Sequence, residues 1–117
     1  MKLHHVQVAM PPDSEDEARE FYRDALGLSE VEKPSSLPAE GAWFVRGDLE
    51  LHLGVQEEFV PATKAHPAIL VDDLGDITDR LRHVGYEVRP DGRLPGFDRC
   101  YTDDPFGNRI ELLTPSE

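Results

Sequence analysis

Apolar and polar residues along the first half of the chain predict a strand and then a helix. Alternation predicts a strand over residues 3–9, and apolar residues at helical spacing predict a helix over residues 13–27. Ser14 and Glu17 have the spacing of a capping box at the start of this helix. The apolar stripe of the helix consists of Ala18, Phe21, Tyr22, Ala25 and Leu26.

The rest of the first half is expected to form three strands. Residues 28–33 are predicted as a short strand, and the Pro- and Ser-rich residues 34–41 as a surface loop. Residues 42–55 have the pattern of a hairpin that turns at Gly47 and Asp48. The order of elements in this half is therefore βαβββ.

The second half repeats this order. A strand is predicted over residues 66–73 and a short strand over residues 86–90. A hairpin is predicted over residues 98–113, with residues 103–108 as its turn. The helix between the first two strands spans residues 74–85, and its apolar face consists of Leu74, Ile77, Leu81 and Val84.

The repeat predicts an α+β protein built from two βαβββ modules. At 117 residues the chain has the length of one domain. The expected organisation is a single domain over residues 1–117, with module one at 1–56, a linker at 57–65 and module two at 66–117.

A His/Glu pair recurs together with the secondary structure. His66 lies 61 residues after His5, and Glu111 lies 61 residues after Glu50. In each half the His opens a strand-like segment and the Glu sits among apolar residues in a late strand. Histidine and carboxylate are the ligands that hold a divalent metal while leaving positions for substrate. The four residues are therefore candidate metal ligands.

Strand alternation adds a fifth candidate and leaves one ligand open. Glu50 and His52 lie two residues apart on one face of their strand, so both could reach a common cleft. Glu111 shares its face with Arg109 and Leu113, and a carboxylate buried there needs a metal or another cation as partner.

Each candidate also has an ordinary structural explanation. Taken singly, a histidine such as His5 or His52 is more often solvated or hydrogen-bonded than a ligand. Glu50 and Glu111 could each face water, because one face of an antiparallel sheet often does. The joint spacing of the four residues shifts the balance towards a site.

The overall charge limits the classes of partner. The formal net charge is −12 and the pI is about 4.7, so nucleic acid and anionic membrane surfaces are unfavourable partners. An anionic substrate would need local cations. The available ones are Arg46, Lys64, Arg99 and Arg109.

Cysteine content and hydropathy bear on location. Cys100 is the single cysteine, so no disulfide framework exists, and it is expected to be a small packed residue. No apolar run approaches the length that crosses a bilayer, and a signal peptide is not apparent. The expected location is the cytoplasm.

The duplicated unit resembles the vicinal oxygen chelate superfamily (the glyoxalase, bleomycin resistance protein and extradiol dioxygenase family). The segments that carry the resemblance span nearly the entire chain, and FYRDALGL and DPFGNRIELL are the most specific of them. The others are LHHVQVAMP, LELHLG and HPAILVDDL.

The resemblance implies a fold and a ligand set. In the family, two βαβββ units form curved sheets that make an open cup around a divalent metal, which would be Zn, Ni, Mn or Fe(II). Members similar to glyoxalase use four ligands, matched here by His5, Glu50, His66 and Glu111. Members similar to dioxygenases use two His and one Glu, which His5, His66 and Glu111, or a set with His52, could supply.

The resemblance also implies three functions. The first is a glyoxalase/isomerase-type enzyme that binds a small oxygenated substrate through vicinal oxygens, with Glu111 as first choice for general base and Glu50 as second. The second is an extradiol-type dioxygenase. The third is a protein that binds an antibiotic or similar small molecule without catalysis, in a cleft lined by aromatic residues such as Trp43, Phe59 and Phe97.

Further expectations concern the substrate and assembly. Ala9 stands where proteins similar to glyoxalase I have a basic residue that meets glutathione, which predicts a different substrate. Open sheets of this family usually pair, so a homodimer is expected. The substrate cleft is predicted to include Trp43, Arg99, Tyr101 and Arg109.

Overall fold

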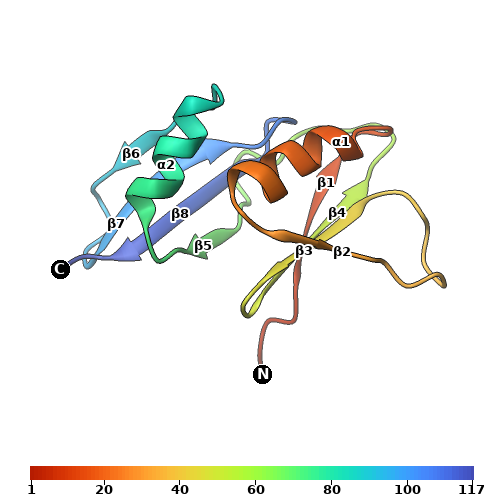
Figure 1. Ribbon diagram of the computed structural model, residues 1–117, viewed down its shortest axis with the longest axis horizontal. Coiled ribbons are helices and arrows are strands. Elements are labelled where there is room, and N and C mark those ends of the chain that lie inside the picture. The colour runs from red at the N-terminus through yellow and green to blue at the C-terminus, as the bar shows by residue number, and fades with distance from the viewer. The chain divides into compact units, whose positions relative to one another are not determined.

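The computed structural model describes residues 1–117 as two compact modules, Met1–Pro61 and Ala62–Glu117. Each module contains one four-stranded mixed sheet with helical segments, which confirms the predicted α+β class and the βαβββ repeat (Figure 1). No helix has both the length and the apolar character that a membrane crossing requires.

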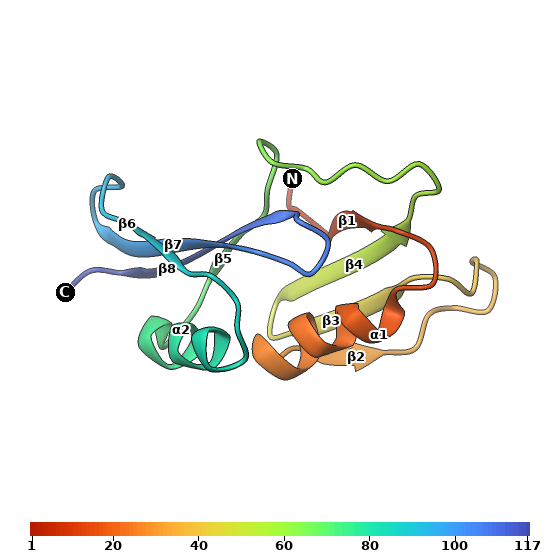
Figure 2. The same ribbon diagram turned by 90° about the horizontal axis from the view of Figure 1, so that it is seen from above.

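Module one forms a sheet with strand order β1-β4-β3-β2, in which β1 is parallel to β4 and the other pairs are antiparallel. Its helical segment lies along one face of this sheet (Figure 2). Phe21, Tyr22, Phe44 and Leu51 are fully buried and form the centre of its core. Its elements are β1 (Val6–Met10), α1 (Glu15–Ala18), η1 (Arg19–Ala25), β2 (Ser29–Val31), β3 (Ala42–Arg46) and β4 (Leu49–Val55).

Module two repeats this topology with strand order β5-β8-β7-β6, and β5 runs parallel to β8. Helix α2 lies across one face of the sheet (Figures 1 and 2). Ile77 and Leu81 of α2 are buried together with Cys100, Ile110 and Leu112 of the strands. Its elements are β5 (Ala68–Leu70), α2 (Leu74–His83), β6 (Arg89–Asp91), β7 (Phe97–Asp103) and β8 (Arg109–Pro115).

The first helix differs from the sequence expectation in its cap and its winding. The Ser14 hydroxyl donates to the carbonyl of Pro12 at 3.1 Å, so the predicted capping box with Glu17 is wrong. Residues Arg19–Ala25 wind as a π-helix, and the N–H of Leu26 donates to the carbonyl of Phe21, five residues back.

The apolar face of the second helix is shorter than predicted. The helix ends at His83, and Val84 is 58% exposed, so its assignment to the buried face was wrong. At the start, Asp73 caps the helix by accepting a hydrogen bond from the N–H of Asp76.

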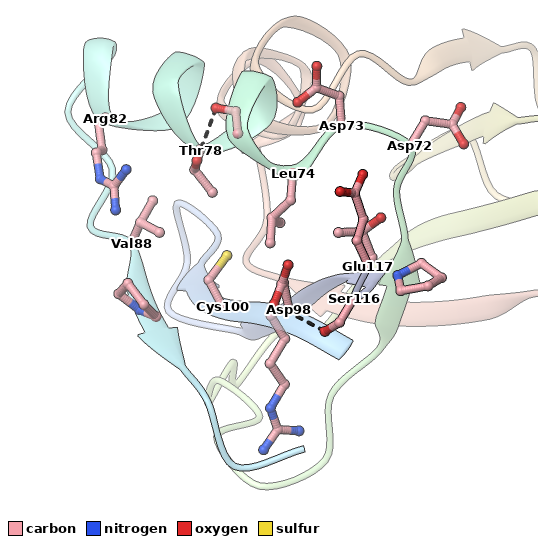
Figure 3. Close-up of a pocket in the computed structure, with 15 residues that line it drawn as sticks. Asp72, Asp73, Leu74, Thr78, Arg82, Val88, Asp98, Cys100, Ser116 and Glu117 are labelled. Atoms are coloured by element: carbon pink, nitrogen blue, oxygen red, sulfur yellow. Dashed lines mark hydrogen bonds between the residues drawn. The ribbon is translucent and has the colours of Figure 1, made fainter. Parts of the chain in front are cut away.

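Cys100 lies on the helical side of the module-two sheet, as a packed residue that is 2% exposed. It borders a hollow of about 690 Å³ beneath α2 (Figure 3). Burial raises the pKa of the Cys100 thiol, although the nearby Arg82 and Arg89 oppose this shift. The thiol should therefore be protonated and unreactive at neutral pH.

We predict that Cys100 reacts with Ellman's reagent at pH 8 at least about tenfold more slowly in the native protein than in guanidinium-unfolded protein. The measurement is the absorbance of released thionitrobenzoate with time. Equal rates would show that the helical side of this module opens readily.

Candidate functional site

One face of the module-two sheet carries most of the polar residues of its strands. Strand alternation places Cys100, Ile110 and Leu112 against α2, which leaves the neighbouring positions on the opposite face. Tyr101 and Glu111 are direct cross-strand partners there. The face carries Arg89, Asp91, Arg99, Tyr101, Asp103, Arg109 and Glu111.

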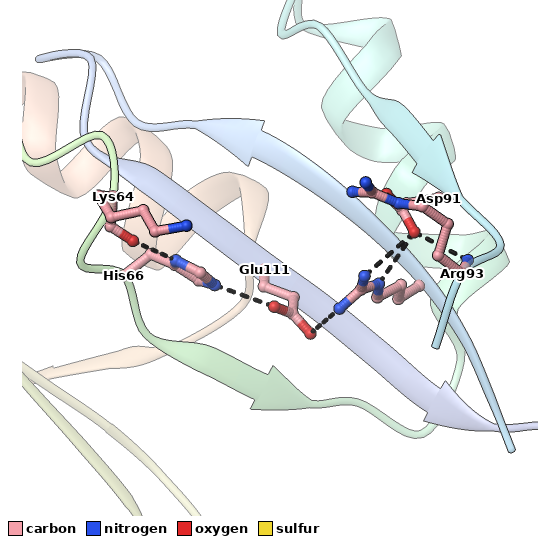
Figure 4. Close-up of polar contacts among 6 residues, drawn as sticks. Lys64, His66, Asp91, Arg93 and Glu111 are labelled. Carbon is pink, nitrogen blue, oxygen red and sulfur yellow. Dashed lines mark hydrogen bonds and ion pairs between the residues drawn. The ribbon is translucent and has the colours of Figure 1, made fainter. Parts of the chain in front are cut away.

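His66 and Glu111 lie in direct contact on this face (Figure 4). The His66 Nε2 atom is 3.0 Å from Glu111 Oε1, and its Nδ1 atom is 2.8 Å from the carbonyl oxygen of Lys64. A carbonyl oxygen only accepts, so Nδ1 carries a hydrogen and Nε2 faces the carboxylate. The Glu111 side chain is 8% exposed and that of His66 is 23% exposed.

The second oxygen of Glu111 is held by Arg99. Arg99 Nη1 is 3.4 Å from Glu111 Oε2, and the same guanidinium donates to Asp91 at 3.1 and 3.2 Å. A hydrogen bond from Arg93 holds the pKa of Asp91 well below its usual range, and Arg99 contributes further. The chain of contacts from His66 to Arg93 therefore fixes the Glu111 carboxylate from both sides (Figure 4).

Two guanidinium groups lie close to the ring of Tyr101. The Cζ atoms of Arg99 and Arg109 are 5.2 and 5.4 Å from the centre of its ring. His66 meets the same ring edge to face at 5.7 Å. The predicted cleft residues Arg99, Tyr101 and Arg109 therefore gather beside the His66–Glu111 pair.

Module one contains a stack of three rings. The His52 ring lies parallel to that of Trp43 at 3.9 Å and is stacked on that of His5 at 4.3 Å. His52 is 5% exposed, and burial, together with the nearby His5, lowers its pKa. His52 therefore holds its neighbour rings in place, and its neutral imidazole could also serve as a ligand.

Glu50 lies near His4, a contact that the sequence analysis missed. Its carboxylate is 3.6 Å from His4 Nδ1, which lies 2.9 Å from Nδ1 of His5. In a regular strand, alternation would turn His4 away from His5, but β1 begins only at Val6, so strand geometry does not apply to His4. The Glu50 side chain is 41% exposed, unlike the buried Glu111.

Each module thus brings a histidine and a carboxylate of the repeat to one region. Neither module by itself gathers three or more His, Cys, Asp or Glu side chains that could hold a metal ion. The donor atoms of module two nevertheless suit a metal ion. In metal sites, a histidine typically binds through one nitrogen and donates from the other to a carbonyl, as His66 does.

Asp104 and Asn108 support the strand that carries Glu111. The buried Asp104 carboxylate accepts hydrogen bonds from the N–H groups of Phe106 and Asn108 and from the Asn108 amide. The Asn108 side-chain oxygen accepts from the N–H of Ala62. The sequence predicts a turn at residues 103–108 from its composition, and this hydrogen-bond network is what holds that turn in place.

Comparison with known proteins identifies the family. The model described as the Glyoxalase/Bleomycin resistance protein/Dioxygenase superfamily matches residues 2–112. The chain belongs to this superfamily. The resemblance predicted from the sequence is thereby confirmed. No curated protein matches the chain.

Several solved structures resemble the chain over nearly its whole length. A Bacillus anthracis protein ascribed to the glyoxalase family is 42% identical, with 99% of this chain and 96% of that chain covered and a TM-score of 0.95. Lactoylglutathione lyase from Agrobacterium tumefaciens is 25% identical, with coverage of 93% and 91% and a TM-score of 0.69. TnmS3, an antibiotic binding protein from Streptomyces sp. CB03234, shares the fold at 22% identity, with 99% of each chain covered and a TM-score of 0.76.

Proposed function

We propose that the protein is a metal-dependent enzyme of glyoxalase/isomerase type that acts on a small oxygenated substrate. The observation that carries this proposal is the contact between His66 Nε2 and Glu111 Oε1, with His66 Nδ1 tied to a backbone carbonyl. His66 Nε2 and the Glu111 carboxylate would hold a divalent metal, which would compete with protons for these two groups.

The candidate ligands are those that the sequence repeat indicates in each half of the chain. They are His66 and Glu111 in the second half, and His5 with Glu50 or His52 in the first. His52 is held between two rings and could serve as the second ligand of the first half, whereas the partly exposed Glu50 can change partners and is better suited to act as the base. The donors are nitrogen and oxygen atoms, which suit Zn, Ni, Mn or Fe(II).

A bound divalent ion would polarise the oxygens of the substrate and stabilise negative charge as it develops. The protein must then supply a base that removes a proton from carbon. Both oxygens of Glu111 already have partners, whereas Glu50 contacts only the exposed His4. The contacts thus favour Glu50 as the base and Glu111 as a ligand, which reverses the order expected from the sequence.

Proton exchange at carbon tests this function without a known substrate. We predict that metal-loaded protein catalyses exchange of the α-hydrogen in small α-hydroxy carbonyl compounds in D₂O, measured by proton NMR. The exchange should stop on chelation and fall at least about 100-fold in Glu50→Gln. Metal-loaded protein without exchange on any member of the panel would contradict the proposal.

A second candidate function is non-catalytic binding of a small molecule. The stack of Trp43, His52 and His5 favours it, because stacked rings offer a flat surface to an aromatic ligand. TnmS3 is a fold relative described as antibiotic binding. Ligand binding that survives chelation would favour this function over the enzyme.

The dioxygenase alternative uses the ligands His5, His66 and Glu111. Oxygen uptake by protein loaded with ferrous iron, measured with catechols as substrates, distinguishes this alternative from the isomerase.

A further inference from the structure

We propose that Arg109 and Tyr101 form an oxyanion-binding subsite beside Glu111, so that the substrate is a small acid with a carboxylate or phosphonate group next to its vicinal oxygens. This inference rests on the proposed function and adds the class of substrate to it. It concerns module two alone.

The subsite lies next to the proposed metal ligand. Arg109 and Glu111 are two residues apart on β8, so their side chains leave the same face of the sheet. Tyr101 is the cross-strand partner of Glu111, and the Arg109 guanidinium lies over its ring. A substrate oxygen near Glu111 and an acidic group at Arg109 could therefore belong to one small molecule.

Arg109 is the cation of this face whose charge no protein carboxylate matches. Its cross-strand partner is Asp103, the natural candidate for an ion pair. Asp103 instead accepts two hydrogen bonds from Arg89, both at 3.0 Å. Arg99 is paired with Asp91 and Glu111. No ion pair or side-chain hydrogen bond forms at Arg109, although its chain has a net charge of −12.

The surroundings of the Arg109 guanidinium suit the binding of an anion. The Arg109 guanidinium lies over the Tyr101 ring, with Cζ 5.4 Å from the ring centre, and its side-chain N–H groups donate to no protein acceptor. A guanidinium edge matches the two oxygens of a carboxylate or phosphonate. The negative net charge of the chain repels anions at long range. An acid would therefore bind well only if it contacts both this local cation and the metal.

The first test observes Arg109 itself in the metal-free protein. Methylphosphonate and acetate are titrated separately while the arginine Nε–Hε resonances are followed by NMR. The expected result is a saturable shift of the Arg109 resonance with at least one of the two anions, while Arg82 on α2 serves as the internal control. An Arg109 resonance that moves no more than that of Arg82 with either anion would overturn the subsite.

The second test uses two chelating ligands that differ by one acidic group. Calorimetry with metal-loaded protein compares hydroxymalonate with glycolate, which lacks the second carboxylate. Arg109→Gln should weaken hydroxymalonate binding at least about tenfold and leave glycolate binding nearly unchanged. Arg82→Gln should change neither.

The outcomes separate this inference from the proposed function. If the protein binds metal but Arg109→Gln affects both ligands equally, the subsite is wrong and the metal enzyme stands. If the wild-type protein binds no metal, the proposed function fails, and the metal-free titration still decides whether Arg109 binds oxyanions.

Discussion

Replacing Glu111 by Gln is expected to weaken the binding of a divalent metal at least about 100-fold, because the amide removes a charged ligand from the proposed site. The change preserves the size of the side chain and one oxygen, so the sheet should remain intact. Calorimetric titration of tag-free protein with Zn²⁺ measures the affinity, and the thermal midpoint of the metal-free variant checks its fold.

The matched control for this variant is Glu87→Gln. Glu87 is also a carboxylate of module two, but its side chain is 75% exposed and pairs only with the partly exposed Arg89. We expect its metal affinity to equal that of the wild type. If Glu111→Gln and Glu87→Gln bind Zn²⁺ equally well, Glu111 is not a ligand and the proposed site is wrong.

The second large effect concerns the turn that supports Glu111. Asp104→Ala should lower the free energy of unfolding by about 4 kcal/mol, because three hydrogen-bond donors lose a buried charged acceptor. Chemical denaturation monitored by circular dichroism measures this change.

The neighbouring Asp103 provides the control. Its side chain is 46% exposed and its main contact is an ion pair with Arg89, so Asp103→Ala should cost no more than about 1 kcal/mol. Equal losses in the two variants would show that the Asp104 network does not hold the turn.

The repeat can be predicted from the sequence because each of its elements is indicated by a short segment of the chain. Apolar periodicity and turn residues specify both hairpins, and alternation places Glu111 and Arg109 on one face, as the structure has them. The equal spacing of His5, Glu50, His66 and Glu111 indicates which residues to compare between modules. In module two the structure brings His66 and Glu111 into direct contact.

The sequence could not predict contacts in which one side chain has several possible partners. Alternation puts Asp103 opposite Arg109, but it cannot tell that Arg89 from the next strand takes the carboxylate. It likewise fails at His4, which precedes the first strand and reaches Glu50. Ser14 shows the same limit, since its hydroxyl finds the Pro12 carbonyl in place of the helix N–H groups.

These contacts also change the interpretation of individual residues. His52 was an open candidate ligand, and the structure shows it held between Trp43 and His5. Arg99 was a candidate cleft residue, and it is the partner of Glu111. Arg109 therefore becomes the residue of this face that is best placed to meet an anion.

The most direct test of the account is the metal content of the wild-type protein. Tag-free protein is stripped with chelator, incubated separately with Zn²⁺, Ni²⁺, Mn²⁺ and anaerobic Fe²⁺, desalted and analysed for metal and protein. The account predicts one tightly bound ion per pair of His66 and Glu111, and therefore one per chain, for at least one of these metals. Wild-type protein that retains none of the four ions would contradict it.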